Sequence, residues 1–169
     1  MFSIPAAGTR ARIAEQFAGN PVIKAVAPDE VAAIADASLD LIVANSLLQY
    51  LDAATLDDLI ETWKAKLKPG GRLVLADVIP PDVSPLTDAA ALLTFAWQGG
   101  FLGAALTGLV RTFFSDYRKL RGELGISTYS EPDIRLILDR HGMSCTRLVK
   151  NIGHNPARMS FEAKVRSDA

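Results

Sequence analysis

Two groups of polar side chains stand where ligands bind in many α/β proteins. Asn45 and Ser46 directly follow the apolar run Leu41-Ile42-Val43-Ala44, and Asp77 directly follows the run Leu73-Val74-Leu75-Ala76. Neither run alternates with polar residues, which is typical of parallel strands buried on both faces. Ligands of open α/β sheets bind beyond the carboxyl ends of such strands. The sequence therefore predicts a binding site at Asn45, Ser46 and Asp77.

The segment between these two runs has the pattern of a helix. Apolar residues recur at spacings of three and four: Leu56, Leu59, Ile60, Trp63 and Leu67. Acidic residues open the segment and lysines close it, which suits the helix dipole, and Pro69-Gly70-Gly71 ends it. A strand, helix and strand in this order form a crossover, so both predicted strands end at the same edge of one sheet.

The rest of the chain continues this alternation. We expect a helix over Thr9 to Phe17, a strand over Val22 to Val26, and a helix that begins at a capping box from Ser130 to Asp133. Met143 to Ile152 and Arg158 to Val165 read as two strands with a short loop between them, which fits an antiparallel hairpin. The pattern predicts an α/β fold in one domain over 1–169, with a mostly parallel sheet that ends in this hairpin.

Composition limits the class of protein. The chain has 169 residues, of which 49% are hydrophobic and 22% charged, as in one globular domain. It has 18 basic and 19 acidic residues without runs of like charge, which argues against nucleic-acid binding. Its one cysteine, Cys145, and two histidines argue against a disulfide framework and a zinc site. The cytoplasm is the expected location, since Met1 to Pro5 is too short for a signal peptide.

One uncharged stretch departs from this picture. Ala89 to Val110 contains 22 consecutive residues without a charge, which is long enough to span a membrane. Polar residues and glycines interrupt it, so two short apolar helices folded over a site are the favoured interpretation, within an insertion at about 82–126. A homodimer contact or a peripheral membrane contact through 89–110 is the alternative use of this surface.

The sequence resembles a known family at these same places. The phrase DASLDLIVANSLLQYLD, followed by LKPGGRLVLADVIPP, the long insertion, and a closing helix and hairpin resemble small-molecule class I S-adenosylmethionine-dependent methyltransferases. The resemblance covers about Ile4 to Val165. It implies a Rossmann-like sheet of seven strands with an antiparallel last strand, and S-adenosylmethionine as the cofactor.

The resemblance also exposes a gap. Family members begin with a strand and a glycine-rich cofactor loop, and no Gly-x-Gly-x-Gly motif is present here, so we expect an N-terminally truncated family member. Roughly thirty to sixty residues would be missing. In the family's strand order the missing strand lies beside Leu41 to Ala44. Another chain could supply it, Val22 to Val26 could pair with Leu41 to Ala44 instead, or the chain could fold poorly; we favour the second option.

The resemblance implies roles for residues near the strand ends. Its cofactor-binding positions correspond to Asp29, Glu30, Asn45 and Ser46, although all four types also favour helix starts and turns. Candidates for contacts with the acceptor are Gln49, Tyr50, Trp97 and Tyr117. The catalytic candidates are Asp77, which could orient or deprotonate the acceptor, and His154, which suits a general base but lies in a hairpin turn. Arg158, next to that turn, is expected on a solvated face.

Two functions from different classes remain open. The first is transfer of a methyl group to a small acceptor of apolar character by direct displacement, for which the protein mainly supplies proximity and shape. The second is a non-catalytic, truncated family member that acts as an interaction or partner subunit. A Rossmann-type nicotinamide oxidoreductase is disfavoured by the antiparallel hairpin and by the absence of a Gly-x-Gly-x-x-Gly motif.

Overall fold

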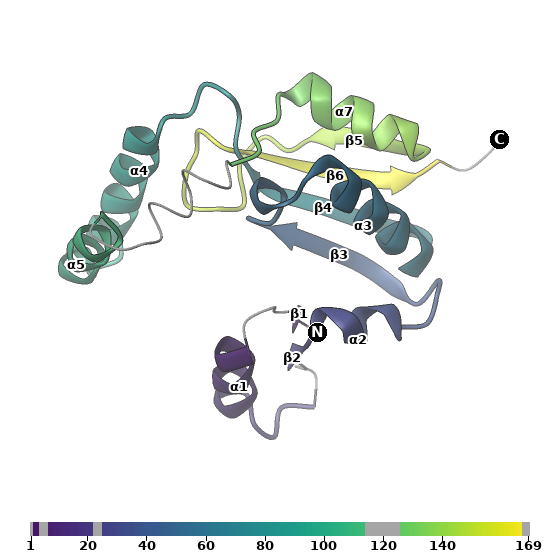
Figure 1. The fold of residues 1–169 in the computed structure, drawn as a ribbon, viewed down its shortest axis with the longest axis horizontal. Coiled ribbons are helices and arrows are strands. Elements are labelled where there is room, and N and C mark those ends of the chain that lie inside the picture. The colour runs from purple at the N-terminus through teal and green to yellow at the C-terminus, as the bar shows by residue number, and fades with distance from the viewer. Residues whose placement is uncertain (1, 4–6, 22–24, 114–125, 167–169) are drawn as a thin grey trace.

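The main body of the protein is a four-stranded sheet. The computed structural model describes residues 2–3, 7–21, 25–113 and 126–166. The strand order is β3-β4-β6-β5 (Figure 1). β3 (Leu39–Asn45) pairs in parallel with β4 (Leu67–Val78), whereas β6 (Met159–Val165) is antiparallel to both β4 and β5 (Met143–Arg147). The predicted α/β fold and the antiparallel C-terminal hairpin are therefore confirmed.

β4 forms the buried centre of this sheet. Its apolar run Leu73 to Ala76 is at most 7% exposed, as the lack of polar alternation predicts. The predicted stop at Pro69-Gly70-Gly71 instead lies inside the irregular first part of β4. Gly70 has a φ of 77°, and a Cβ on Gly71 would lie 3.0 Å from the carbonyl oxygen of Leu39. The two glycines thus let β4 approach β3 where their register shifts.

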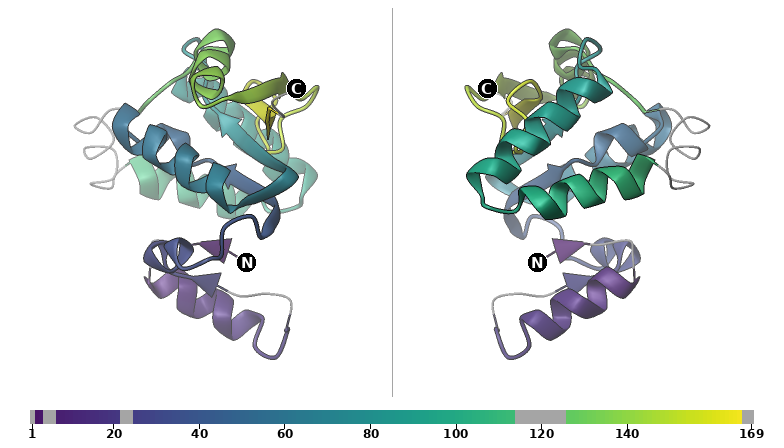
Figure 2. Two further views of the ribbon diagram at one scale, coloured as in Figure 1. Left: turned by 90° about the vertical axis from the view of Figure 1, so that its right-hand side faces the viewer. Right: turned by 90° about the vertical axis from the view of Figure 1, so that its left-hand side faces the viewer.

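Two helices cover one face of the sheet. α3 (Ala53–Lys66) buries Leu56, Ile60 and Trp63, and α7 (Glu131–Arg140) buries Ile134 and Leu138, in one core with the strands (Figure 2). Each of these side chains contributes about 1.5–3 kcal/mol through burial. Both helices begin at a side-chain cap. The Thr55 amide donates to Asp52, and the Asp133 amide donates to Ser130.

A histidine joins these two helices. His141, at the end of α7, has Nδ1 2.6 Å from Glu61 Oε1 and Nε2 2.9 Å from Asp57 Oδ1, and both carboxylates belong to α3. Lys64 of α3 donates to the His141 carbonyl oxygen, and Arg140 lies 3.7 Å from Asp57. Burial opposes a charged ring, but the hydrogen bonds to Glu61 and Asp57 outweigh it and raise the pKa of His141. The same contact lowers the pKa of Glu61.

The N-terminal elements form a separate unit. β1 (Phe2–Ser3) and β2 (Ala25–Val26) pair in parallel as a two-stranded sheet, with α1 (Ala7–Gln16) between them and α2 (Pro28–Ala32) leading to β3. The prediction that the strand at Val22 to Val26 pairs with β3 is wrong for its described part. Ala25 and Val26 pair with β1 instead, because β1 offers a parallel partner.

This arrangement leaves one side of β3 open. Among the described residues, β3 pairs with β4 alone. Leu41 is 46% exposed and Val43 is 49% exposed, whereas Ala44, which faces α3, is 5% exposed. The prediction that Leu41 to Ala44 is buried on both faces is therefore wrong. The helices cover only the face of Ile42 and Ala44, and the structure describes no strand beyond the free edge.

Two apolar helices lie beyond the carboxyl ends of β3 and β4. α4 (Pro85–Gln98) and α5 (Leu102–Phe113) pack side by side as a hairpin (Figures 1 and 2). They turn at Gly99 and Gly100, the second of which has a φ of 75°. Over residues 85–113, the described helical part of this stretch, the chain thus forms two helices with a glycine turn between them. Within the described part of the chain, no helix is long and apolar enough to cross a membrane.

Candidate functional site

The carboxyl ends of β3 and β4 meet at Ser46 and Asp77. The Ser46 hydroxyl donates to Asp77 Oδ2 at 2.6 Å, and the Ser46 amide donates to the Ala76 carbonyl at 3.0 Å. Ser46 has a φ of 52° and Asp77 a φ of 61°, values that are uncommon for residues other than glycine. Such backbone strain is typical of functional sites. The two predicted residues are therefore in contact, in a conformation that the surrounding fold must maintain.

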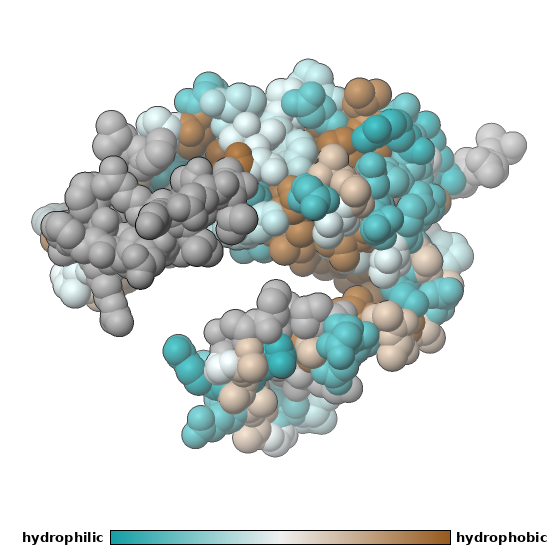
Figure 3. Space-filling model, viewed as in Figure 1, coloured by the Kyte–Doolittle hydropathy of each residue, from teal (hydrophilic) through white to brown (hydrophobic). Residues whose placement is uncertain are grey.

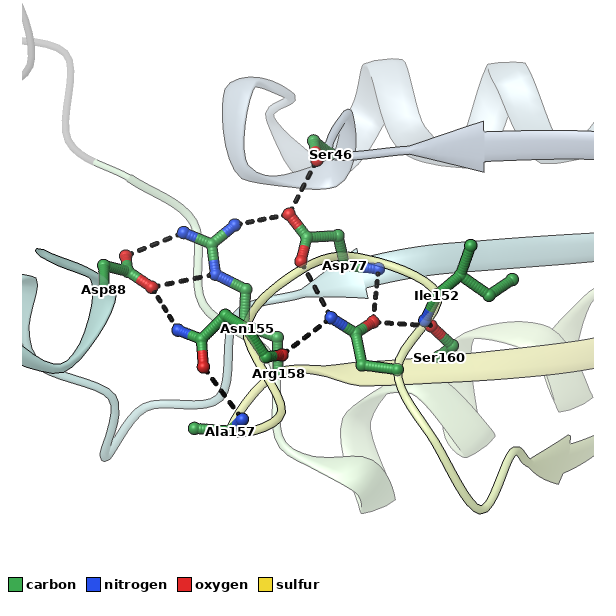
Figure 4. A network of polar contacts seen from close by, with 9 residues as sticks. Ser46, Asp77, Asp88, Ile152, Asn155, Ala157, Arg158 and Ser160 are labelled. Carbon is green, nitrogen blue, oxygen red and sulfur yellow. Dashed lines mark hydrogen bonds and ion pairs between the residues drawn. The ribbon is translucent and has the colours of Figure 1, made fainter. Parts of the chain in front are cut away.

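Asp77 is a buried anion with several donors. Its side chain is 4% exposed, and Arg158 Nη1 donates to Oδ2 at 2.6 Å (Figure 4). Asn151 Nδ2 donates to Oδ1 at 3.0 Å, and Asn151 Oδ1 accepts from the Asp77 amide at 3.2 Å. Both oxygens of this carboxylate are thus occupied by donors within the protein.

Arg158 links this anion to the helical hairpin. It donates through Nε and Nη2 to both carboxylate oxygens of Asp88 on α4, at 3.0 and 2.7 Å, and Asn155 donates to Asp88 at 2.6 Å (Figure 4). Burial opposes the charge of Arg158, but the hydrogen bond to Asp88 and the charges of Asp77 and Asp88 outweigh it and raise its pKa. The Arg158 side chain is only 10% exposed, so the expectation of a solvated residue is wrong.

The loop between β5 and β6 approaches Asp77 closely. A Cβ on Gly153 would collide with Asp77 Oδ1, so only glycine fits there without a shift of the carboxylate. Asn151 also accepts from the Ser160 hydroxyl at 2.7 Å, and the Ile152 amide donates to Ser160 (Figure 4). The loop is thereby fixed over the end of β4.

His154 lies in the same loop and contacts α4. Its ring is 5.8 Å from that of Phe95, and Phe95 packs edge-on against Phe101 at the start of α5, at 5.6 Å. His154 is exposed to solvent, in contrast to Asp77. The two catalytic candidates therefore belong to one neighbourhood, since Gly153 touches Asp77, but only the histidine is accessible.

Gln49 carries an unsatisfied polar atom near the end of β3. It lies in the short helix η1 (Leu48–Tyr50) and is 7% exposed, yet its Oε1 atom has no hydrogen-bond partner among the residues that the structure describes. A buried acceptor without a partner is costly, by about 1–3 kcal/mol. Such an atom is what a hydrogen-bond donor on a bound ligand would satisfy. Tyr50, next to it, is 61% exposed.

The remaining candidates lie apart from this cluster. Glu30 accepts a hydrogen bond from the Ala27 amide at 2.6 Å and so caps α2, and Asp29 is exposed in the same helix of the N-terminal unit. Trp97 is 75% exposed on α4. Tyr117 lies outside the described residues. The structure thus joins Ser46 to Asp77, and it shows no bond between these two and either acid of α2 among the residues it describes.

Sequence reasoning missed Asp88, Asn151 and Asn155 as members of the network. Asp88 reads as an ordinary acid in the first turn of a helix, and its partners are 67 to 70 residues away. The one available signal was the pair of amide side chains, Asn151 and Asn155, close together in a hairpin loop.

Comparison with known proteins supports the fold. No family model matches the sequence, and no curated protein matches it. Solved structures do match. The CurJ carbon methyltransferase superposes with a TM-score of 0.62 at 18% identity, over 98% of this chain and 41% of its own. The DhpI complex with S-adenosylhomocysteine superposes with a TM-score of 0.57 at 13% identity, over 96% of this chain and 64% of DhpI.

A third match is magnesium protoporphyrin IX methyltransferase from Synechocystis PCC 6803 with bound S-adenosylhomocysteine. Its TM-score is 0.55 at 19% identity, over 98% of this chain and 63% of the other. The chain therefore has the fold of class I S-adenosylmethionine-dependent methyltransferases. It spans less than two thirds of the length of each of these three proteins.

Proposed function

We propose that this chain takes part in S-adenosylmethionine-dependent methyl transfer to a small acceptor. The observation that carries the proposal is the superposition of nearly the whole chain on methyltransferases, two of them bound to S-adenosylhomocysteine. The position of Ser46 and Asp77 agrees with it, because ligands of such sheets bind at the carboxyl ends of the strands.

The residues at the end of β3 suit such a cofactor. Asn45 is exposed at the last position of β3, and Ser46 directly follows it at the carboxyl end of the strand. In this proposal Asn45 and Ser46 hold the cofactor, and Gln49 and Tyr50 face the acceptor. S-adenosylmethionine supplies an electrophilic methyl group when bound.

The side chains of the site would act mainly by positioning. A direct displacement requires alignment of the acceptor, and it requires a base only when the acceptor must lose a proton. Asp77 is bound to Arg158, so its proposed part is to fix the ends of β3 and β4 rather than to move a proton. His154 is exposed and next to the hairpin α4–α5, so we assign proton removal to it where the acceptor carries one.

The acceptor is proposed to be apolar. The hairpin α4–α5 exposes three aromatic side chains beyond the strand ends, with Phe95 47%, Trp97 75% and Phe101 39% exposed. Pockets for small molecules are lined mainly by apolar and aromatic side chains with few polar groups. These aromatic side chains would supply the apolar contacts with the acceptor, and Gln49 and His154 would supply the polar contacts.

A second candidate is a non-catalytic partner subunit. Two features favour it: no described strand pairs with the second edge of β3, and Leu41 and Val43 are half exposed on the sheet face opposite Ile42 and Ala44. In that case the fold serves to bind another protein, and the cofactor site is vestigial.

Calorimetric titration with S-adenosylhomocysteine up to millimolar concentration separates the two candidates. The first predicts measurable heat and a thermal shift of a few degrees, since a ligand that binds only the folded state stabilises it. Asn45→Ala should weaken this binding several-fold, whereas Ser144→Ala, at an exposed strand position of β5, should not change it. No heat and no thermal shift would reject cofactor binding by this chain and leave the partner subunit.

A further inference from the structure

The helical hairpin α4–α5 is a packed unit of its own. Ala96 on α4 is fully buried and Ala105 on α5 is 8% exposed, where the two helices pack against each other. The Phe101 amide donates to the Ala96 carbonyl at 2.9 Å, and the rings of Phe95 and Phe101 meet edge-on at 5.6 Å. Contacts inside the hairpin therefore fix how its two helices lie relative to each other.

The hairpin lies outside the hydrophobic core of the main body. That core joins α3, α7 and the strands of the main sheet, and no described residue of 85–113 belongs to it. Figure 1 shows the hairpin beyond the carboxyl ends of β3 and β4, and Figure 3 shows hydrophobic residues gathered over the main body near β3 in the same view. An element outside the core can move at a lower free energy than a core helix.

The contacts between the hairpin and the main body converge on one stripe of α4. Among the residues that the structure describes, Asp88 makes every hydrogen bond and ion pair that joins the two, and its partners are Asn155 and Arg158. Phe95, seven residues later, adds the ring contact with His154. Residues at this spacing share one face of a helix. All three partners belong to the loop between β5 and β6, so one short stripe centred on an ion pair holds the hairpin.

Arg158 can release the hairpin and still hold the end of β4. Its Nε and Nη2 atoms donate to Asp88 at 3.0 and 2.7 Å, whereas Nη1 donates to Asp77 at 2.6 Å (Figure 4). The guanidinium presents its donors in a rigid fork, so the two carboxylates occupy different parts of it. Loss of the Asp88 contact leaves one cation beside one anion, and neither is then a buried charge without a partner.

The connection before α4 has the form of a hinge. Ile79 is 5% exposed, and its carbonyl accepts from the Tyr129 amide at 2.9 Å, so the chain is fixed up to this residue. The helix α4 begins directly after its cap, Ser84. Two fixed points are thus separated by residues 80–83. Hinges are commonly a few loop or element-terminal residues of this kind.

We propose that the hairpin α4–α5 is a lid over the carboxyl ends of the sheet, and that the ion pair between Asp88 and Arg158 is the latch that holds it closed. When this pair breaks, the lid moves as one unit about residues 80–83, while Arg158 keeps its bond to Asp77. The proposal goes beyond methyl transfer and does not depend on it, because the latch consists of side chains of this chain and needs no cofactor.

Double electron–electron resonance between two spin labels measures the position of the lid. The labels are attached at Gln98→Cys, at the end of α4, and at Leu136→Cys on α7, in a Cys145→Ser background; Gln98 and Leu136 are both exposed. We expect one narrow distance distribution while Asp88 is in place. In Asp88→Asn, which keeps the shape of the side chain but removes its charge, a second population at a different distance should become the larger one.

Two controls separate movement of the lid from loss of structure. Asp58→Asn removes an exposed acid of α3 and should leave the distance distribution unchanged. Circular dichroism of both asparagine variants should equal that of the labelled parent, because the lid moves without losing its helices. Urea denaturation should show a cooperative transition in both variants, since the lid is not part of the core.

Each other outcome overturns the proposal. The same distance distribution with and without Asp88 shows that the ion pair is not a latch, and a broad distribution in the labelled parent shows that the pair does not hold the hairpin. A loss of helical signal in Asp88→Asn shows that the hairpin unfolds instead of moving as a unit. Loss of cooperative unfolding shows that the hairpin belongs to the main fold. Since no arm contains cofactor, failure here is separate from failure of the titration with S-adenosylhomocysteine.

Discussion

Arg158 determines whether two carboxylates can be buried close together. It donates to Asp77 at the end of β4 and to Asp88 on α4, and its own side chain is 10% exposed. One cation between two anions leaves a net negative cluster, which is acceptable only because hydroxyl and amide groups donate to the remaining oxygens. The arginine therefore holds together three segments that are distant in the sequence.

Replacing Arg158 by methionine should strongly destabilise the protein. The change leaves Asp77 buried without its cation, which costs about 3–5 kcal/mol. Urea denaturation followed by circular dichroism measures the change in the free energy of unfolding. Arg72→Met is the control, because Arg72 is exposed, its partner Glu162 is only half-buried, and such surface pairs contribute at most about 1 kcal/mol. Similar losses for both variants would show that burial of Asp77 does not require Arg158.

For single residues, the sequence predicts where a side chain lies in the fold better than which side chains it contacts. Ser46 and Asp77 were found because each follows an apolar run, and their contact follows from two neighbouring parallel strands. The sequence predicts a solvated Arg158, because a charged residue in a hairpin has no local pattern that indicates burial. Its partner Asp77 is 81 residues away, so only the assembled fold reveals the ion pair.

At the scale of elements, His141 makes the packing of α7 on α3 sensitive to pH. Its pKa is raised above the ordinary value of about 6.5 by Glu61 and Asp57. A histidine whose pKa is higher in the folded state than in the unfolded state stabilises the folded protein. This stabilisation is complete at pH values below the pKa of the unfolded state, and it is lost as the pH rises through the pKa of the folded state.

The free energy of unfolding should therefore show a larger difference between the wild type and His141→Asn near pH 6 than near pH 9. Urea denaturation at several pH values across this range measures the difference. Glu61→Gln should reduce the same pH dependence, because it removes one acceptor of the ring. A difference that is constant, or that grows with pH, would contradict the assignment.

The elements themselves were largely predictable. Regular apolar spacing and capping residues identify α3 and α7, and Ser130 with Asp133 forms the predicted capping box. The exposure of β3 was not predictable, because a continuous apolar run indicates a strand that suits burial on both faces. It does not reveal whether a neighbour is present to bury it.

At the scale of the whole molecule, the two sheets should differ in stability. Leu73, Leu75 and Phe161 are fully buried in the main body. In α1, by contrast, every side chain whose burial the structure describes is at least partly exposed. Local opening requires least free energy where few apolar contacts are lost.

Native-state hydrogen exchange should therefore find α1 and β2 opening well below the free energy of global unfolding. The amides of β4 and β6 should exchange only by global unfolding. The control is α7, which buries Ile134 and Leu138 and should follow the main sheet. Equal protection of α1 and α7 would show that the N-terminal unit unfolds together with the main sheet.

The edge of β3 that no described strand covers has a consequence for the protein in a cell. An apolar strand edge such as Leu41 to Asn45, which carries no charged residue, is a template for uncontrolled association that ends in aggregates rather than in a defined complex. Newly made chains whose edge stays uncovered are then lost to chaperones, proteases or deposits, and more of them are lost at higher concentration. We therefore expect the amount of soluble protein to be limited by what covers Leu41 and Val43, more than by the stability of the core.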